Sequence, residues 1–392
     1  GRTGTVDWQT GSIKTSTFTA ANGEGYFADT SSTAFIMNLP AGTAGNIVSV
    51  VDYTNTFQTN NLTVAPNGSE KIGGVAATVA LSTEGQSVTF VYVDATEGWK
   101  NVQDSTSNVT GTTYITATGG TPSQDGDYEI RTFTGPGTFC VSGLASNSLN
   151  NVVDYLVVAG GAGGGNAGGN YGAGGGGAGG YRTSFSTPTT GVTVTAASFP
   201  ITVGAGGASR AGAVVNRGNV GSDSVFSTIT STGGGGGGGV GSTGCTGTGG
   251  TGGSGGGGGG TSNGPGPRVA GGAGNTPATP VSQGNSGGSG VVCAGGGGGG
   301  GGASATGTTR TPSVAGNGGN GSPNSISAST VTYAGGGGGS YYTGPLATGT
   351  GGSGGGGPSL NPATGPGDSG DAFPGTINTG GGGGGTHNGD SG

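Results

Sequence analysis

Charged and aromatic residues are scarce in this chain. Only 7% of its 392 residues are charged and 6% are aromatic, and the one histidine, His387, lies five residues before the end. A single histidine leaves little room for a Ser-His-Asp triad or a histidine-rich metal centre. We therefore expect the protein not to be an enzyme, with no catalytic residues, no metal site and no cofactor.

Cysteines and long apolar runs are also nearly absent. Cys140, Cys245 and Cys293 are widely spaced, and this odd number contains no C-x-x-C pair. The pattern fits neither a disulfide framework nor a zinc site, and it predicts small buried thiols. No apolar run approaches the roughly 18 residues that a membrane span needs, so we expect no membrane insertion. Because the sequence starts at Gly1 rather than Met, we expect a processed product or a piece of a longer protein.

An excess of acidic residues is confined to the first part of the chain. Residues 1–150 hold five Lys or Arg against twelve Asp or Glu, whereas the remainder holds five Arg against five Asp. The second part therefore lacks the basic face that nucleic-acid binding requires. Nucleic acid is not an expected partner.

Glycine is the residue that the chain has in excess. It occupies 107 positions, 88 of them after residue 150, against an ordinary share of about 7%. Glycine buries no side chain and loses the most backbone freedom when it is ordered. Because buried N–H and C=O groups need partners, the glycine tracts either stay disordered or pair their backbones between neighbouring helices.

The stretch Gly233–Gly260 favours paired backbones. Read in threes from Gly244, the first position is always glycine, and the second carries Cys245, Thr248, Thr251 and Ser254. A polyproline II helix has three residues per turn, so two of its edges would be nearly bare and the third would be polar. The predicted scaffold glycines are Gly233, Gly236, Gly239, Gly256, Gly259, Gly297, Gly337 and Gly382.

The first tract, Gly160–Gly180, breaks this period. Its Ala, Asn and Tyr residues fall on all three edges of a threefold helix. This predicts that part of the tract is an edge rod or a loop. The tracts that start at 233, 295, 335 and 380 are unevenly spaced, which favours parallel rods joined by loops of different length over a solenoid of equal repeats.

The chain before the glycine tracts has the pattern of short β-strands. Residues 1–104 form a predicted β-rich module with core residues Tyr92 and Trp99, and residues 105–111 form a linker. A second β-region, 112–159, contains a hairpin turn at Asp125-Gly126 and leads into the glycine-rich domain, 160–392, which has variable loops and a β-insert near 190–230. The strands predicted in the first module are Thr17–Thr19, Phe35–Leu39, Ile47–Tyr53, Leu62–Ala65 and Val88–Val93.

Three short motifs have catalytic or ligand-binding alternatives. Gly163–Gly168 matches the dinucleotide pattern G-x-G-x-x-G, but it lacks a following helix and an acidic residue about 20 positions on. Gly252–Gly256 matches the nucleophile elbow G-x-S-x-G, as chance allows in a tract of glycine and serine. Asp125–Glu129 could offer oxygens to calcium, although a hairpin with solvated carboxylates is the simpler interpretation.

A few large side chains stand out between the glycine tracts. Aromatic rings and arginine are typical anchors of binding surfaces, and recognition usually lies on loops held by a rigid scaffold. The same side chains could instead shield backbone from water. The candidate receptor-binding residues are Arg268, Arg310, Tyr341, Tyr342, Phe373 and His387.

Several segments resemble proteins of tailed bacteriophages. KTSTFTAANGEGYFADT, MNLPAGTAGNIVSVVDY, NLTVAPNGSEKIGG and FVYVDATEGW, within residues 8–100, resemble a β-module of fibre and virion structural proteins, particularly those of marine cyanobacterial phages. GDYEIRTFTGPGTFCVSG is similar to the β-region that precedes the body of phage glycine-rich proteins, a likeness that covers residues 112–392. The glycine tracts with intervening loops also resemble the polyglycine II sandwich adhesins at fibre tips, which differ in attaching through a helical region.

These resemblances imply a fold class and a function. The fold would be all-β N-terminal modules, sandwich-like or barrel-like, followed by a polyglycine II helix sandwich with essentially no α-helix. The function would be that of a virion appendage protein, a tail fibre or adhesin. Its partners would be a host cell-surface polysaccharide or outer-membrane protein, other virion fibre or tail proteins, and copies of itself, with a trimer favoured. The alternative is a purely structural fibril or decoration subunit that assembles through its glycine rods. A third possibility, ice binding by a flat Thr array, finds regular spacing only at Thr248 and Thr251.

Overall fold

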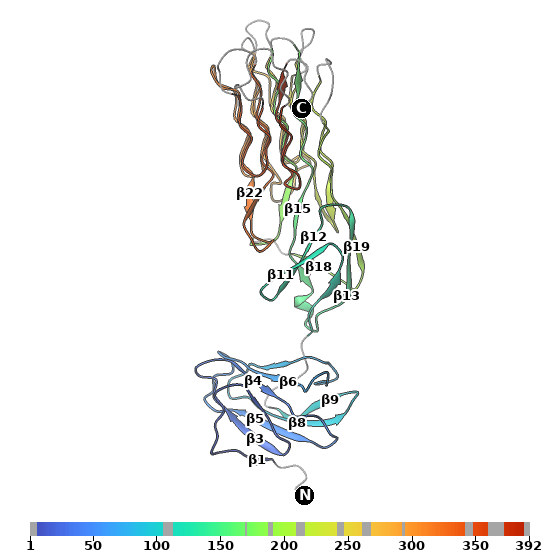
Figure 1. Cartoon of the computed structure of the whole chain (residues 1–392), viewed down its shortest axis with the longest axis vertical. Helices are drawn as coiled ribbons and strands as arrows, with labels where there is room; N and C mark the ends of the chain where they lie inside the picture. Colours follow the sequence, from blue (N-terminus) through green and yellow to red (C-terminus); the bar gives the residue numbers. More distant parts are fainter. Residues whose placement is uncertain are drawn as a thin grey trace. The chain divides into compact units, whose positions relative to one another are not determined.

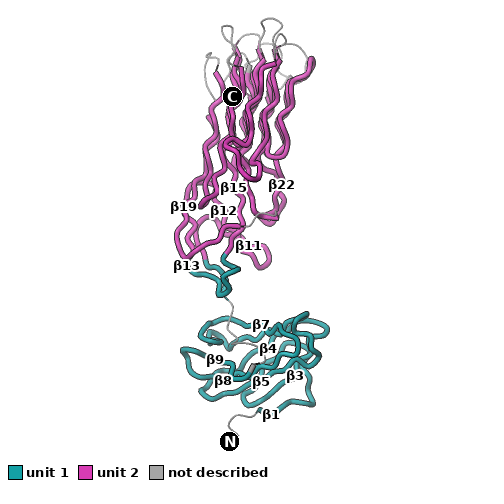
Figure 2. Tube along the Cα trace, turned by 180° about the vertical axis from the view of Figure 1, so that it is seen from behind, with its two compact units in different colours: residues 1–116, 143–151 teal, residues 117–142, 152–392 magenta. Residues whose placement is uncertain are grey.

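The chain is all-β and divides into two compact units. The computed structural model describes residues 6–104, 113–168, 171–186, 191–208, 216–240, 247–260, 268–291, 295–341, 348–359 and 372–387. Unit 1 comprises Gly1–Thr116 and Gly143–Asn151, and unit 2 comprises Ala117–Ser142 and Val152–Gly392 (Figure 2). Within the described ranges the helical element is a 3₁₀ turn, η1 (Ser148–Asn150). The prediction of an all-β fold without α-helix is confirmed, while the predicted linker 105–111 lies outside the described residues.

Unit 1 is a sandwich of two sheets (Figure 1). One sheet has the order β1-β3-β5-β8-β9 and the other has the order β2-β4-β6-β7. The strands are β1 (Asp7–Trp8), β2 (Phe18–Thr19), β3 (Glu24–Ala28), β4 (Phe35–Asn38), β5 (Ile47–Asp52), β6 (Leu62–Ala65), β7 (Val79–Leu81), β8 (Ser87–Asp94) and β9 (Gly98–Asp104).

The chain alternates between these two sheets from β1 to β6. As a result β1, β3 and β5 pair in parallel in one sheet, and β2, β4 and β6 pair in parallel in the other. A parallel pair needs a crossover connection, and here a strand of the opposite sheet supplies it. The antiparallel pairs β6–β7, β5–β8 and β8–β9 follow once the chain stops alternating.

The core of unit 1 fills the space between the sheets. Alternate residues of β4, β6 and β8 point inward and are buried, as expected of strands with one solvated face. The largest fully buried side chains of this core are Trp99, Phe57, Phe90, Met37, Leu39, Leu62, Ile72 and Leu81. The predicted core positions of Trp99 and Tyr92 are confirmed, at 0% and 9% exposed.

Unit 2 begins with a small sheet of order β10-β13-β19-β20-β21. Phe139, Phe199 and Phe226 pack against one another in it, with ring centroids 6.0 to 6.3 Å apart. The sheet contains β10 (Thr116–Thr118), β13 (Gly137–Gly143), β19 (Ser198–Thr202), β20 (Ser224–Phe226) and β21 (Ile229–Ser231). The predicted turn at Asp125-Gly126 joins the hairpin β11 (Thr121–Asp125) and β12 (Tyr128–Thr132), where Gly126 has a φ of 56°.

Short two-stranded ladders complete the regular structure of unit 2. They mark places where the chain enters or leaves the glycine-rich segments. The paired strands are β14 (Val152–Val153) with β18 (Val192–Thr193), β15 (Leu156–Val158) with β17 (Tyr181–Thr183), β16 (Asn166–Ala167) with β24 (Thr386–His387), and β22 (Ser322–Asn324) with β23 (Val331–Tyr333).

The glycine tracts form extended rods that lie side by side (Figure 1). The rod at residues 171–180 shows their geometry best. Its N–H groups at 174, 177 and 180 bond to residues 238, 235 and 232; those at 175 and 178 bond to 298 and 301; those at 176 and 179 bond to 383 and 380. Three successive N–H groups thus point to three different neighbours, and every third one returns to the same neighbour. This is the threefold period of a polyglycine II helix.

Rod 171–180 is the centre of a hexagonal arrangement. Its carbonyls at 177, 175 and 176 accept from Ala162, Gly257 and Gly337, so the rod bonds to six neighbours in all. Each of these six rods also bonds to the next one, so that together they close a ring around rod 171–180. In ring order they are 159–168, 232–240, 254–260, 296–302, 334–341 and 380–387.

The lattice replaces side-chain packing with backbone packing. A Cβ added to Gly174, Gly175, Gly176 or Gly177 would lie closer than 3.0 Å to a carbonyl oxygen of a neighbouring rod. Glycine is therefore required by the spacing of the rods as well as by their backbone pairing. The small side chains Ala162, Ala173 and Ala178 are buried among them.

The described residues of the first tract form neither an edge rod nor a loop, contrary to the prediction, and residues 169–170 lie outside the description. Residues 159–168 belong to the ring, and 171–180 are the central rod. The tract accommodates alanine methyl groups: buried Ala173 packs with Ala167 and Val240 near one end of the rods. The period predicted for Gly233–Gly260 does describe an outer rod, 247–253, in which Thr248 and Thr251 are exposed while Gly249, Gly250, Gly252 and Gly253 are buried.

Polar side chains complete the hydrogen bonding of the outer rods. Asn317 Oδ1 accepts from the Thr350 N–H at 2.9 Å, and Asn320 Oδ1 accepts from the Ser353 N–H at 3.1 Å. Thr308 Oγ1 accepts from the Asn317 N–H at 2.7 Å. These contacts satisfy backbone groups that have no further rod beside them, which gives a physical role to the Ser, Thr and Asn between the glycines.

Candidate functional site

The central rod begins at Tyr171. Several ring rods have one of their ends beside this residue. Gly260 donates to the Gly172 carbonyl, and Ser340 donates to the Ala173 carbonyl. Ala167 bridges to Val240 and pairs with His387 of β24. We call this end of the lattice the rod end. The rod end contains residues 168, 240, 260 and 341, each of which is the last described residue before an undescribed segment.

Arg310 and Tyr341 are brought together at the rod end. The Arg310 guanidinium lies over the Tyr341 ring, 4.8 Å from its centroid, and Nη2 donates to the Tyr341 hydroxyl at 2.9 Å and to the Pro312 carbonyl at 3.3 Å. Arg310 is only 3% exposed, and its buried Nε has no hydrogen-bond partner. A Cβ on Gly296 would collide with both side chains. Arg310 therefore fixes the position of the half-buried Tyr341, in part through a cation–π contact.

The other predicted binding residues have different surroundings. Arg268 is exposed, and Phe373 is 52% exposed. The backbone of His387 pairs with Ala167, and Tyr342 lies outside the described residues. The structure therefore places the backbone or side chains of five of the six predicted residues in the rods that reach the rod end.

Tyr171 is a rod-end residue that the sequence interpretation did not select. It starts the central rod and packs against the buried cluster of Ala167, Ala173 and Val240. Its sequence signal is its size, since it is the largest side chain within the tract Gly160–Gly180. A large residue inside a glycine tract is tolerated where the rods end and space opens.

The predicted scaffold glycines all lie inside the lattice and are buried. An added Cβ would lie closer than 3.0 Å to a neighbouring atom at each of them. For most, that atom is a backbone carbonyl oxygen; for Gly259 it is the Val240 side chain. The eight residues are Gly233, Gly236, Gly239, Gly256, Gly259, Gly297, Gly337 and Gly382.

The two glycine motifs with catalytic alternatives are engaged in lattice bonds. In the segment 163–168, the N–H groups of Gly163, Gly165 and Gly168 donate to neighbouring rods, so they are not available to a phosphate. Ser254 of the G-x-S-x-G match is 0% exposed, and its hydroxyl has no hydrogen-bond partner. Its N–H bonds to Ala178, at the opposite end of the central rod from β24.

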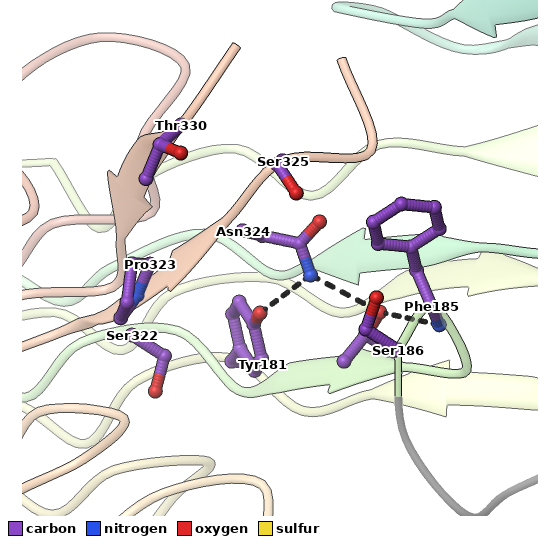
Figure 3. Close-up of a pocket in the computed structure, with 9 residues that line it drawn as sticks. Tyr181, Phe185, Ser186, Ser322, Pro323, Asn324, Ser325 and Thr330 are labelled. Carbon is purple, nitrogen blue, oxygen red and sulfur yellow. Dashed lines mark hydrogen bonds between the residues drawn. The ribbon is translucent and has the colours of Figure 1, made fainter. Parts of the chain in front are cut away.

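A cleft of about 460 Å³ lies at the opposite end of the rods, between β17 and the β22–β23 hairpin (Figure 3). Buried Asn324 spans it: Nδ2 donates to the Tyr181 hydroxyl at 2.8 Å and to Thr183 Oγ1 at 3.3 Å, and Oδ1 accepts from the Ile326 N–H. Burial raises the pKa of Tyr181, the negative charge of a deprotonated Tyr333 would raise it further, and the Asn324 hydrogen bond acts in the opposite direction. The tyrosine is therefore neutral at ordinary pH.

Other ionisable groups of the described chain do not form a metal site. No three His, Cys, Asp or Glu side chains cluster among the residues that the structure covers. Cys140 is a half-buried free thiol, and the other two cysteines lie outside the description. The described part also contains no helix with the length and apolar character needed to span a membrane.

Comparison with known proteins gives one family. A family model described as a glycine-rich domain matches residues 137–392, which include the small β-sheet from β13 onward and all of the rods. No curated protein matches the chain.

Proposed function

The chain belongs to the glycine-rich domain family, and from this premise we propose that it is a virion appendage protein of a tailed bacteriophage. In this proposal it is a non-enzymatic tail fibre or adhesin that recognises the host cell surface through its rod end. The phage-like segments of residues 8–100 and the β-region before the glycine tracts support the virion origin.

The observation that carries the proposal is the closed ring of six rods around a seventh. Every one of these rods is held on several sides by backbone hydrogen bonds, so their ends keep fixed relative positions. Side chains at such ends are ordered before a ligand arrives, which reduces the entropy that binding has to overcome. Recognition residues commonly lie at the ends of rigid scaffolds of this kind.

The side chains near the rod end fit a surface ligand of mixed character. Phe373 and Arg268 are exposed, and Tyr341 presents a ring whose orientation Arg310 fixes. Aromatic and arginine side chains can contact the apolar faces and the hydroxyl or carboxylate groups of a polysaccharide, or a loop of an outer-membrane protein. We propose one of these as the host partner.

Unit 1 has a surface suited to attachment within the virion. Trp8, Phe27 and Tyr53 form a row over β1, β3 and the end of β5, with ring centroids 5.2 and 6.2 Å apart. Trp8 is 39% exposed and Tyr53 is 54% exposed. Exposed aromatic patches often mark protein interfaces. This supports a role for unit 1 in contacts with other fibre or tail proteins and in a homo-oligomer, of which a trimer is favoured.

Cell adsorption tests the proposal. The labelled full chain is incubated with a panel of marine cyanobacterial strains, and the bound fraction is measured for the wild type and for a Tyr341→Ala, Phe373→Ala double variant. We expect binding to a subset of strains, weakened about tenfold or more in the variant, as for truncated anchor residues. The matched control is Ile377→Ala, an 84% exposed apolar residue in the turn that precedes the ring rod 380–387, at the other end of the lattice.

Two outcomes would contradict host recognition. If the double variant adsorbs as well as the wild type, the rod end is not the binding surface. If no strain binds the chain and light scattering instead shows concentration-dependent assembly, the chain is a structural fibril or decoration subunit.

A further inference from the structure

The cleft between β17 and the β22–β23 hairpin is separate from the rod end. Tyr181 and Phe185 come from the segment that follows the central rod, and Ser322, Asn324, Ser325 and Thr330 come from the hairpin (Figure 3). Its volume of about 460 Å³ lies within the range of ligand sites, roughly 300 to 1,000 Å³. The cleft can therefore hold a small molecule or a short stretch of a polymer.

Among the residues that the structure describes, the lining of this cleft carries no charged side chain. Two aromatic rings, several hydroxyls, a proline and one amide make up its wall. The Tyr181 hydroxyl accepts a hydrogen bond from Asn324, so its own hydrogen can be donated to a ligand. Ser325 and Thr330 are exposed, and their hydroxyls can both donate and accept. A charged ligand would find no counter-charge here.

We propose that this cleft is a second binding site, and that its ligand is a neutral polysaccharide. Sugar rings have an apolar face of C–H groups and a rim of hydroxyls. Half-buried Phe185 and Tyr181 offer ring surface to the first, and the hydroxyls of the lining offer both donors and acceptors to the second. The cleft is open to the surface, so a short stretch of a long chain can enter it.

Both walls of the cleft are anchored in the rod lattice. Tyr181 directly follows the central rod, and its N–H donates to the Gln283 carbonyl at 2.8 Å. β23 leads directly into the ring rod 334–341. Both walls are thus continuous with the lattice. Asn324 is 7% exposed and joins the two walls through Tyr181 and Thr183, so the width of the cleft is set before a ligand binds.

The test uses defined oligosaccharides and the full chain. Saturation-transfer NMR and calorimetry are run with gluco-, galacto- and mannohexaose, with hexagalacturonate as an acidic probe, and with an uncharged Ser/Pro-rich peptide. We expect at least one neutral hexasaccharide to bind. Phe185→Ala should weaken this binding about tenfold. Tyr181→Phe, which keeps the ring but removes the hydroxyl that donates to the ligand and accepts from Asn324, should weaken it about threefold. The matched controls are Tyr128→Phe at a 78% exposed tyrosine and Ile377→Ala, and both should bind as the wild type does.

Each result decides the inference. It is overturned if a folded wild type gives no transfer signal with any neutral hexasaccharide, if hexagalacturonate or the peptide binds more tightly, or if Tyr181→Phe and Phe185→Ala bind unchanged. The inference does not depend on the rod end. If rod-end variants lose cell adsorption but no oligosaccharide binds, only the cleft proposal fails. If an oligosaccharide binds but rod-end variants adsorb to cells normally, only the proposed function fails.

Discussion

The two units reach a buried interior by opposite means. In unit 1 the interior is made of large side chains such as Trp99, Phe57 and Phe90, each 0% exposed. In unit 2 the interior of the lattice is main chain, and most of its glycines are held at distances that leave no room for a Cβ. The first interior is stabilised mainly by burial of apolar surface, and the second by a dense set of backbone hydrogen bonds and close backbone contact.

This difference predicts opposite responses to mutation. A side-chain core is damaged most when a large residue becomes small, because a cavity remains. A main-chain lattice is damaged most when a small residue becomes larger, because the neighbouring rod must move and its hydrogen bonds break. Substitutions in the two units can therefore test this reversal.

A branched side chain in the central rod should have the largest effect. In Gly176→Val the added Cβ would overlap the Ala162 and Gly163 carbonyls, and two further carbons would have no space. We expect the lattice of unit 2 not to form, a loss of more than about 3 kcal/mol. Hydrogen-exchange mass spectrometry would show fast exchange throughout the rods.

The control for this variant is Gly206→Val. Gly206 is exposed, and the nearest atom to an added Cβ is the Gly161 carbonyl oxygen at 3.7 Å. In this variant the rod amides should be as well protected from hydrogen exchange as in the wild type. If Gly176→Val keeps slow exchange in the rods, the lattice is looser than the structure indicates.

A truncation in the side-chain core of unit 1 should have the next largest effect. Trp99 stacks edge-on against Tyr92 at 5.6 Å, and its Nε1 donates to Glu70 at 3.2 Å. Trp99→Ala should cost about 3 to 5 kcal/mol, measured by urea denaturation with hydrogen exchange as the readout for unit 1. Trp8→Ala, at a 39% exposed position, should cost less than about 1 kcal/mol. Equal losses in the two variants would argue against a side-chain core.

Much of unit 1 can be predicted from its sequence. β4, β6 and β8 are predictable because each is a short apolar segment bounded by turn residues, and the structure shows that alternate residues of each are buried. β3 was missed because it contains Gly25, which looks like a turn residue, whereas a Cβ there would collide with the Trp8 ring. β9 was missed because it starts at Gly98, a residue type that suggests a turn, whereas a Cβ there would collide with the Lys71 carbonyl. In both cases a tertiary contact overrides the local signal.

The lattice is predictable in kind but not in arrangement. The three-residue period of Gly233–Gly260 indicates polyglycine II geometry, yet nothing local shows which rod is central. The irregular first tract provides the central rod, and its alanines Ala173 and Ala178 are buried there. Among the candidate binding residues, the sequence cannot show that Arg310 is buried against Tyr341, since the two are 31 positions apart and meet only through the rods.

Neighbouring glycines of one ring rod should differ in their tolerance of a methyl group. At Gly382 an added Cβ would lie closer than 3.0 Å to the Gly176 carbonyl oxygen, whereas at Gly383 the nearest atom is 3.5 Å away. Gly382→Ala should destabilise unit 2 by about 1 to 3 kcal/mol. Gly383→Ala should be near neutral or slightly stabilising, because alanine restricts the unfolded chain. Equal effects in urea denaturation would mean that backbone spacing does not set the glycine requirement.

Alkaline pH should have the smallest effect, a loss of stability in unit 1 that depends on Tyr26. Burial, together with the hydrogen bond to Glu24 and its charge, raises the pKa of Tyr26 to about 12, while the Ala21 N–H acts in the opposite direction. Because the pKa in the folded state lies above the unfolded value of about 10, this phenol contributes stability that is fully present below about pH 10. That contribution is lost as the pH rises toward 12.

Unit 1 should therefore lose stability over this pH interval through Tyr26. Tryptophan fluorescence during urea denaturation reports on unit 1, because both tryptophans lie in it. Tyr26→Phe should lower stability at neutral pH, since the Ala21 N–H loses its acceptor at 2.7 Å, but it should flatten the decline at high pH. The slope is the deciding quantity: a decline as steep in Tyr26→Phe as in the wild type would show that another group is responsible. In unit 2 the raised pKa of Tyr181 acts in the same direction at the edge of the lattice.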